Sequence, residues 1–189
     1  MRATFLPAFL LALISAPLAS QATVQAFGGD TFRLSLPAGY RLLSKGRPGP
    51  GMMAFGFATD QRVDGTRALI QVTLVDLDRV SAGPAPTLDE LAASMIGGVR
   101  QRRNAWQQAD SFVDVDGVHA KRIAWSGTNE PSPERPPQQA ASTMRGIMVV
   151  GMKGTVAFVL HAQDVEPFAA NSLPVSEKAL MTFALTPHS

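Results

Sequence analysis

The stretch Thr31–Tyr40, TFRLSLPAGY, combines the pattern of a half-buried strand with a sharp turn. Phe32, Leu34 and Leu36 alternate with polar residues, and a period of two places all three on one face of an extended chain. The following Pro37-Ala38-Gly39 ends the strand, since proline and glycine favour turns over continued extension. The stretch therefore predicts a strand that gives one apolar face to a core and then reverses.

Strand patterns continue on the C-terminal side of this turn. Tyr40–Leu43 is predicted to resume the strand, and the Pro- and Gly-rich Lys45–Gly51 predicts a loop. Met52–Thr59 and Arg67–Leu77 follow as strands. Within the second of these, Leu69–Val75 is β-branched and apolar on both faces, which indicates a strand in the middle of a sheet that is covered on both sides.

The strongest helix signal begins at Thr87. Thr87 and Glu90 have the spacing of a capping box, in which each side chain accepts a hydrogen bond from the other residue's backbone N–H. Apolar residues then recur at helical spacing along one stripe: Leu88, Leu91, Ala92, Met95, Ile96 and Val99. Arg100, Arg102 and Arg103 are predicted to close the helix, where positive charge complements the helix dipole. A binding role for these arginines is the alternative.

The C-terminal half predicts two hairpins and a last helix. Phe112–Val115 and Val118–Ser126 turn through Asp116-Gly117, a dipeptide that tight hairpin turns prefer. A polar, Pro-rich surface loop is predicted over Gly127–Ala141, where the long connection offers an adaptable contact element. The remaining predictions are strands over Ser142–Val150 and Thr155–Gln163, a turn at residues 151–154, and a helical stretch over Pro174–Leu185.

Taken in order, these elements resemble the PsbP-like fold, which is also seen in the DcrB group of exported bacterial proteins and in a eukaryotic Ran-binding import factor. The residues that carry the resemblance are Phe32–Tyr40, Thr87–Leu91, Val115–Ala120, Met148–His161 and the closing Phe183 segment. The resemblance implies an α+β fold, an α/β/α sandwich with a central, mainly antiparallel sheet flanked by helices. It implies no catalytic residues, because members of the group do unrelated things and share no catalytic motif.

The first 22 residues have the features of a cleaved secretory signal peptide. Arg2 precedes the apolar run Phe5–Ile14, and small residues at Ser20 and Ala22 suit cleavage after Ala22, with cleavage after Ser20 as the second choice. An uncleaved membrane anchor is the alternative, but the run is shorter than the roughly 20 residues that span a bilayer. Residues 23–189 are then expected to form a single PsbP-like domain in the periplasm or outside the cell.

Composition excludes several classes of function. The chain of 189 residues is 46% hydrophobic and has no cysteine, which excludes disulfides, thiolate metal sites and cysteine nucleophiles. Its 17 cations against 15 anions give no strongly basic face, and removal of residues 1–22 takes away one more cation, Arg2. Binding to nucleic acid is therefore not expected.

Catalytic and metal-binding motifs are not found. Ser126 lacks the leading glycine of a nucleophile elbow, and Gly46–Gly51 lacks the Lys-Ser/Thr ending of a phosphate-binding loop. His119 and His161 are the best metal candidates, with Asp164 three residues after His161. Without a local pair of ligands, however, ordinary strand histidines are the expectation. No catalytic, cofactor-binding or metal-binding residue is assigned.

Three further pairs of side chains are candidates for a functional site. Asp76 with Asp78, and Asp114 with Asp116, each project to one side of a strand, but solvated carboxylates are expected there rather than an acid–base pair. Trp106 and Trp125 are candidates to line a binding cleft. For Trp125, which alternates with an isoleucine in a strand, packing in the core is expected.

These observations predict an exported accessory or interaction protein of the bacterial cell envelope that is not an enzyme and needs no cofactor. Its expected partner is another envelope protein. A periplasmic module that binds a small ligand or a metal ion is the alternative. A flat, exposed apolar patch would favour the first prediction, and a cleft with convergent polar groups would favour the second.

Overall fold

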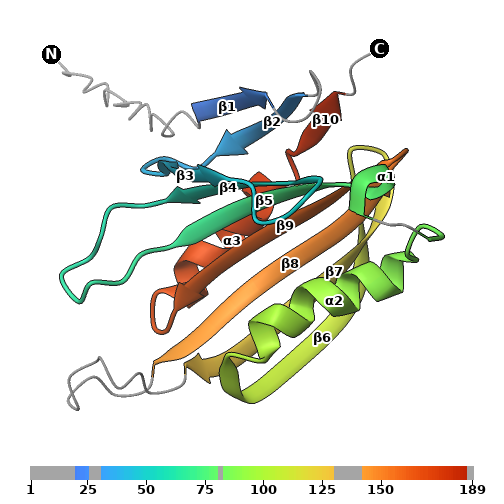
Figure 1. Cartoon of the computed structure of the whole chain (residues 1–189). Helices are drawn as coiled ribbons and strands as arrows, with labels where there is room; N and C mark the ends of the chain where they lie inside the picture. Colours follow the sequence, from blue (N-terminus) through green and yellow to red (C-terminus); the bar gives the residue numbers. More distant parts are fainter. Residues whose placement is uncertain (1–19, 26–30, 81–82, 130–141, 187–189) are drawn as a thin grey trace, which may run out of the picture.

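The computed structural model describes residues 20–25, 31–80, 83–129 and 142–186 (Figure 1). Most of the predicted signal segment and residues 130–141 of the predicted surface loop lie outside these ranges. The elements, in chain order, are β1 (Ser20–Gln25), β2 (Thr31–Leu36), β3 (Arg41–Gly46), β4 (Met52–Ala58), β5 (Leu69–Asp76), α1 (Leu77–Val80), α2 (Leu88–Arg100), β6 (Arg103–Val115), β7 (Val118–Asn129), β8 (Thr143–Lys153), β9 (Val156–Val165), α3 (Ala169–Leu180) and β10 (Ala184–Thr186).

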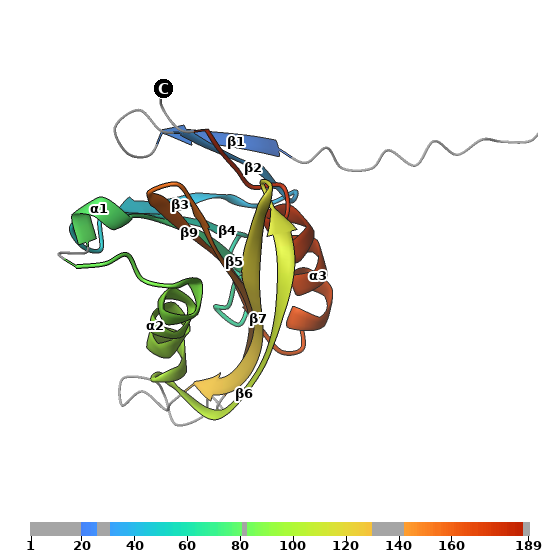
Figure 2. The same ribbon diagram turned by 90° about the vertical axis from the view of Figure 1, so that its right-hand side faces the viewer.

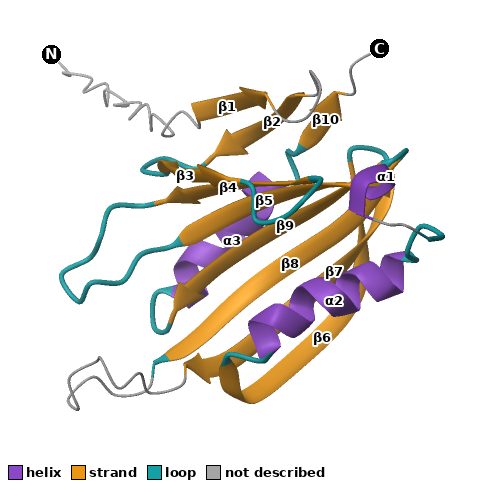
Figure 3. Ribbon diagram, in the orientation of Figure 1, coloured by secondary structure: helices purple, strands orange, loops and turns teal. Residues whose placement is uncertain are grey.

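Two antiparallel sheets contain all of the described strands (Figure 3). The larger sheet has the order β3-β4-β5-β9-β8-β7-β6. The chain forms two meanders, β3-β4-β5 and β6-β7-β8-β9, joined by a crossover from β5 to the edge strand β6 that contains α1 and α2, and β9 pairs with β5. The smaller sheet has the order β1-β2-β10. Each strand pair in both sheets is antiparallel, as the sequence predicts.

The two faces of the larger sheet are covered differently (Figure 2). Along β9, Phe158 and Leu160 point to the face that α3 and the smaller sheet cover, which we call the α3 face. Val159 and His161 point to the opposite face, where α2 packs across β6, β7 and β8, which we call the α2 face. The predicted sandwich is therefore confirmed in part, since helices lie on both faces but share one of them with a second sheet.

The largest part of the core lies on the α3 face. Phe32 of β2 packs edge-on against Phe55 of β4 and stacks on Phe183, with ring centroids 5.0 and 5.8 Å apart. Leu34 and Leu36 are buried on the same side of β2, while Arg33 is exposed. The alternation read from the sequence of β2 is thus confirmed, and it attaches the smaller sheet to the larger one.

Helix α2 begins as predicted. Thr87 Oγ1 accepts a hydrogen bond from the Glu90 backbone N–H at 3.2 Å, and Glu90 Oε2 accepts one from the Thr87 N–H at 2.8 Å. The backbone N–H and the hydroxyl of Thr87 both donate to the Glu90 carboxylate, and these hydrogen bonds lower the pKa of Glu90. The predicted apolar stripe faces the sheet, with Leu91, Ala92 and Ile96 buried.

The predicted end of this helix was wrong. The helix ends at Arg100, and Arg103 is the first residue of β6, a strand of 13 residues that the sequence predicted only from Phe112 onward. The reason is that β6 is an edge strand with mostly exposed side chains, so its sequence lacks the apolar alternation of a half-buried strand. The Asp116-Gly117 turn between β6 and β7 is confirmed, with φ angles of 53° and 72°.

Other element ends also differ from the prediction. Strand β3 extends to Gly46, into the predicted loop, and β7 extends beyond Gly127 to Asn129. Strand β8 continues to Lys153, so that the chain turns at Gly154. The last helix spans Ala169–Leu180 and holds Pro174 in its interior, whereas the prediction placed a helical stretch over Pro174–Leu185. The predicted C-terminal end was also wrong, because Ala184 and Leu185 belong to strand β10.

Candidate functional site

A cavity of about 270 Å³ lies between α2 and the neighbouring strands β5 and β9 on the α2 face. We call it the α2 groove. It is lined by residues of five elements: Gln71 and Thr73 of β5, Met95, Gly98 and Val99 of α2, Arg103 of β6, Met148 of β8, and Val159, His161 and Gln163 of β9, together with Arg102. Its walls are rigid secondary structure, and polar side chains from three strands converge on it.

A row of aromatic rings crosses the sheet beside the groove. Trp106 of β6 stacks on Trp125 of β7, with ring centroids 5.2 Å apart and planes inclined by 12°. The Trp125 ring lies 5.6 Å from that of His161 on β9. Trp125 is only 4% exposed, so the predicted packing of this side chain in the core is confirmed. The tryptophans adjoin the groove through His161 and Arg103 instead of lining it.

Two glycines make room for this row. A Cβ atom at Gly146 of β8 would lie 2.4 Å from the Trp125 ring, and one at Gly127 would lie 3.3 Å from the Trp106 ring. The register of β6 against β7 shifts between Asn104 and Gln107, where Ala105 adopts a left-handed conformation with φ 47°. Such a bulge turns the following side chain out of the normal alternation of the strand. The glycines and the bulge thus position the tryptophan stack.

His161 is buried and neutral. Its Nε2 accepts a hydrogen bond from the Trp125 indole N–H at 3.2 Å, and because an indole only donates, the proton of the neutral imidazole is on Nδ1. Burial, and secondarily the charge of Arg103, lowers the pKa of His161 to about 4. At neutral pH the ring is therefore an uncharged donor at the wall of the groove.

Arg103 is one of two cationic side chains that line the groove, with Arg102. Its guanidinium lies over the Trp125 ring, 5.3 Å from the centroid, and its Nη1 donates to the Arg102 carbonyl at 3.3 Å. The Nε atom is buried and has no hydrogen-bond partner among the described residues. Burial, and secondarily the charge of Arg102, lowers the pKa of Arg103.

The groove has few groups that could take part in catalysis. Among its lining residues, the titratable side chains are His161, Arg102 and Arg103, and the one hydroxyl, that of Thr73, accepts a hydrogen bond from Gln71 at 3.0 Å. A paired acid and base, or a nucleophile with its activating base, would be needed for general acid–base or covalent catalysis. The lining residues offer neither arrangement, but they offer several donors.

The two predicted metal candidates do not meet. His119 of β7 is exposed, stacks on Phe112 and contacts Asp114 at 3.3 Å, whereas His161 is bonded to Trp125. Asp164 lies on the α3 face of β9, opposite His161, so the pairing of these two residues is wrong. Within the described ranges, no group of three His, Asp or Glu side chains has an arrangement that could hold a metal ion.

The aspartate pairs are split between different partners. Asp76 contacts Arg79 at 3.0 Å, and Asp78 is an exposed residue of α1. Asp114 contacts His119, whereas Asp116 accepts hydrogen bonds from the Lys153 ammonium at 2.7 Å and from the Leu185 backbone N–H at 3.0 Å. Neither pair forms a site. The expectation of a solvated carboxylate was wrong for Asp76 and Asp116, which are 19% and 18% exposed. Asp116 attaches β10 to the β6–β7 turn.

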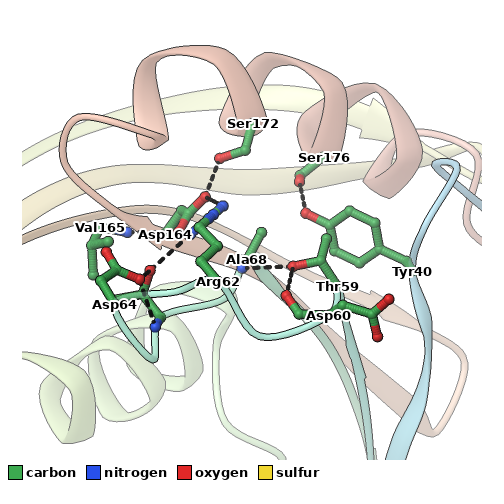
Figure 4. A network of polar contacts seen from close by, with 11 residues as sticks. Tyr40, Thr59, Asp60, Arg62, Asp64, Ala68, Asp164, Val165, Ser172 and Ser176 are labelled. Atoms are coloured by element: carbon green, nitrogen blue, oxygen red, sulfur yellow. Dashed lines mark hydrogen bonds and ion pairs between the residues drawn. The ribbon is translucent and has the colours of Figure 1, made fainter.

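A second polar cluster lies on the α3 face (Figure 4). Asp164 is 1% exposed, and it accepts hydrogen bonds from Arg62 Nη1 and Nη2, both at 2.7 Å, from the Ser172 hydroxyl at 2.6 Å and from the Val165 N–H at 2.8 Å. A cavity of about 290 Å³ adjoins it, bordered by Tyr40. Since Asp164 occupies the guanidinium of Arg62, this cluster holds α3 and the β4–β5 connection to the sheet.

Tyr40 closes the predicted turn at this cavity. Its hydroxyl lies 2.9 Å from the Ser176 hydroxyl of α3, and burial raises the pKa of Tyr40. The aromatic residue of the turn therefore links β3 to the helix above it. The sequence predicted the turn, but no pattern in it indicated the contact between Tyr40 and Ser176.

Sequence reasoning missed the central residue of the α2 groove. Arg103 was interpreted as a residue of the helix end, and Arg102 does fill that role, donating from Nε to the Gly98 carbonyl at 3.2 Å. The glycines at 127 and 146 were the available signal, because an isolated glycine in a strand indicates close approach by another group. Without strand register, they could not be matched to the two tryptophans.

The bent antiparallel sheet, with a helix on each face and a small sheet packed against one of them, is the PsbP-like fold. LpqN of Mycobacterium tuberculosis, a protein involved in cell envelope biogenesis, matches with a TM-score of 0.54 and 16% identity, over 89% of this chain and 91% of LpqN. Cyanobacterial PsbP (CyanoP) of Synechocystis sp. PCC 6803 matches with a TM-score of 0.55 and 13% identity, over 91% of this chain and 96% of CyanoP.

The Pseudomonas aeruginosa protein PA94, of unknown function, matches with a TM-score of 0.51 and 11% identity, over 89% of this chain and 98% of PA94. Neither a family model nor a curated protein matches the sequence. At these identities the similarity shows the fold, and function is argued from the site. No helix within the described ranges is long and apolar enough to cross a membrane.

Proposed function

We propose that the protein is an exported accessory protein of the bacterial cell envelope that acts by binding and not by catalysis. The signal-like segment at residues 1–22 supports export. The similarity to LpqN, a protein of cell envelope biogenesis, supports a role in the envelope. The lining of the α2 groove supports binding, because it carries hydrogen-bonding groups without a catalytic pair.

The α2 groove is the proposed binding site, and the buried Nε of Arg103 is the observation that carries this assignment. A buried N–H group without an acceptor costs free energy, so native structures keep few of them. A ligand is one source of the missing acceptor. Arg103 lines a cavity of about 270 Å³, in which such a ligand would have space.

The size of the groove favours a small molecule. Ligand-binding pockets are concave, largely preformed and typically about 300 Å³ or larger for a drug-sized ligand, so about 270 Å³ suits a small metabolite or one end of a larger molecule. The walls come from one helix and four strands, and a site with walls of regular secondary structure is largely preformed. Binding of a small ligand is the alternative that the sequence analysis gave to contact with another envelope protein. The metal ion that the alternative also allowed is not part of this proposal.

Two neighbouring glycines of α2 give a matched test. A Cβ at Gly98, which lines the groove, or at Gly97, which does not, would meet no atom within 4 Å. Gly98→Leu is expected to fill the groove, whereas Gly97→Leu places the same side chain outside it. A small-molecule screen by thermal shift should give compounds that stabilise the wild type and Gly97→Leu but not Gly98→Leu. Compounds that stabilise all three proteins equally would contradict the assignment.

A protein partner is the second candidate, and strand β3 favours it. All six residues of this edge strand are exposed, including Leu42 at 50% and Leu43 at 53%. An exposed edge offers free backbone groups to which a partner can add a strand. Affinity capture from the envelope fraction should then recover a partner that a Leu42→Ser/Leu43→Ser variant loses. Phe112→Ser, on the other edge strand, should retain it, and a partner retained by both variants would reject this surface.

A further inference from the structure

We infer that the α2 groove binds an oxyanion, the carboxylate or phosphate group of a small ligand, through the side edge of the Arg103 guanidinium. This inference rests on the proposed binding function and adds the chemical class of the ligand. Three independent features of the groove support it: its charge, the free edge of Arg103 and the protonation state of His161.

The charge of the groove is entirely positive. No carboxylate is among its lining residues, and neither Arg102 nor Arg103 forms an ion pair with a described residue. After burial, the positive charge of Arg103 is the second cause that lowers the pKa of His161. The positive charge of Arg102 is likewise the second cause, after burial, that lowers the pKa of Arg103. Eight other Lys, Arg or His side chains of the described residues do have an acidic partner within 4.0 Å. The unbalanced charge is thus a local property of this half-buried site, and it favours an anion.

The geometry of Arg103 selects an oxyanion. Nη1 is bonded to the Arg102 carbonyl, which leaves Nε and Nη2 without a hydrogen-bond partner among the described residues. These two nitrogens carry parallel N–H groups, the fork that binds carboxylate or phosphate with two hydrogen bonds. The Trp125 ring supports the guanidinium from one side and so limits its orientations, and a shift of the side chain towards the cavity would bring the buried Nε to a ligand.

Neighbouring side chains complete a set of donors. The bond from Trp125 fixes the His161 proton on Nδ1, so that the imidazole in the wall of the groove is a neutral donor. Gln163 of β9 and Gln71 of β5 add amide groups to the same lining. Arg102 is partly committed to the helix end through its bond to Gly98, and Arg103 is therefore the residue whose substitution tests the inference.

Tryptophan fluorescence reports on ligands that bind beside Arg103, because the chain has two tryptophans and both lie in the stack next to it. Trp125 also borders a second cavity, lined by Arg122 and Arg145, so substitution of Arg103 decides which of the two cavities gives a signal. Benzoate and phenyl phosphate are the anionic probes. Benzamide is the neutral match of benzoate, and benzylamine is a cationic probe of similar size. Each is titrated into the protein that lacks the signal segment, at constant ionic strength because charge interactions are screened by salt.

The expected result is a saturable change in tryptophan fluorescence with benzoate and phenyl phosphate, and none with benzamide or benzylamine. Arg103→Gln should weaken anion binding by about tenfold or more, since charged hydrogen bonds are among the strong ones. Arg103→Lys keeps the positive charge but loses the pair of parallel N–H groups. This variant should bind the anions more tightly than Arg103→Gln and less tightly than the wild type. Arg47→Gln, at an exposed arginine in the β3–β4 connection, should bind as the wild type does.

Other outcomes separate the inference from the proposed function. Equal anion binding by Arg103→Gln and wild type would overturn the inference, as would saturable binding of benzamide or benzylamine in place of the anions. The second outcome would still support a binding groove, with a different ligand class. Compounds that stabilise the wild type but fail to discriminate Gly98→Leu from Gly97→Leu would instead remove the proposed function.

Discussion

Trp125 on β7 and His161 on β9 are joined by a hydrogen bond of 3.2 Å across β8, the strand that separates them. The bond spans this distance because Gly146, the residue of β8 that pairs with Trp125, has no side chain in the way. The same bond fixes the tautomer of His161 and holds the ring on which Arg103 lies. One contact therefore connects the packing of the sheet to the chemistry of the α2 groove.

Acid is predicted to destabilise the protein through His161. Its pKa of about 4 in the folded state lies below the ordinary value of 6.5, so the unfolded chain binds more protons between these values. Stability from the neutral ring is complete above pH 6.5 and is lost as the pH falls towards 4. Between about pH 7 and pH 4.5, the wild type should lose about 2 kcal/mol more than His161→Gln in urea unfolding.

His119 provides the control for that measurement. It is exposed, so His119→Gln should follow the wild-type dependence on pH. The buried neutral state of His161 would be contradicted if His161→Gln lost stability over this range as steeply as the wild type.

Gly146→Ala is predicted to disrupt the tryptophan stack. The added methyl group would lie 2.4 Å from the Trp125 ring, and forcing extra volume into a packed site costs about 1–3 kcal/mol. The near-ultraviolet circular dichroism of the tryptophans should weaken at the same time. Gly46→Ala, in β3, is the control because its Cβ meets no atom within 4 Å. Equal stabilities of the two variants would show that the stack tolerates the methyl group.

What the sequence could predict depended on burial. Strands with one buried face, such as β2, and the stripe of α2 carry their periodicity in the side chains, and both were located correctly. Strand β6 has few buried residues, so its sequence lacks the apolar alternation of a half-buried strand, even though its partner β7 follows directly after the Asp116-Gly117 turn. The smaller sheet was not predicted because β10 has only three residues and pairs with β2, which lies about 150 positions away.

The ion pair between Arg62 and Asp164 is predicted to contribute strongly to stability. Asp164 is 1% exposed, and Arg62→Gln would leave its carboxylate buried without its cation, a change that typically costs about 3 kcal/mol or more. Arg41→Gln is the control, because the Arg41–Asp60 pair is 69% and 79% exposed and such pairs contribute at most about 1 kcal/mol. Chemical denaturation compares the two, and equal losses would mean that Ser172 and the Val165 N–H suffice for Asp164.

The site was less predictable than the fold, for a reason that these residues illustrate. His161 and Asp164 are three positions apart in the sequence, but an odd spacing in a strand places them on opposite faces of the sheet. Arg103, Trp125 and His161 come from three strands, and only the register brings them together. Residue types alone offered His161 as a metal candidate without assigning a site, whereas the assembled contacts place a neutral imidazole beside a cation that has no ion-pair partner among the described residues.

The capping box of α2 is predicted to stabilise one wall of the groove. Thr87→Ala removes the acceptor for the Glu90 N–H and should lower the free energy of unfolding by about 1 kcal/mol. Gly97→Ala, in the same helix and with free space around its Cβ, should change it in the opposite direction, by about 0.5–1 kcal/mol. Thermal unfolding measures both, and a neutral Thr87→Ala would show that packing against the sheet sets the start of the helix.

Signal cleavage is predicted to shorten β1 without unfolding the smaller sheet. Cleavage after Ala22 removes Ser20–Ala22, which pair with Leu36, Ser35 and Leu34, and leaves Thr23–Gln25 paired with β2. Strand β2 keeps its other neighbour, β10, through the pairing of Phe32 with Leu185, and its buried side chains hold it on the core. Intact mass of the exported protein should match residues 23–189, and hydrogen exchange should show the β2 amides still protected. A mass that includes all 189 residues would contradict cleavage, and a chain that begins at Gln21 would place it after Ser20 instead.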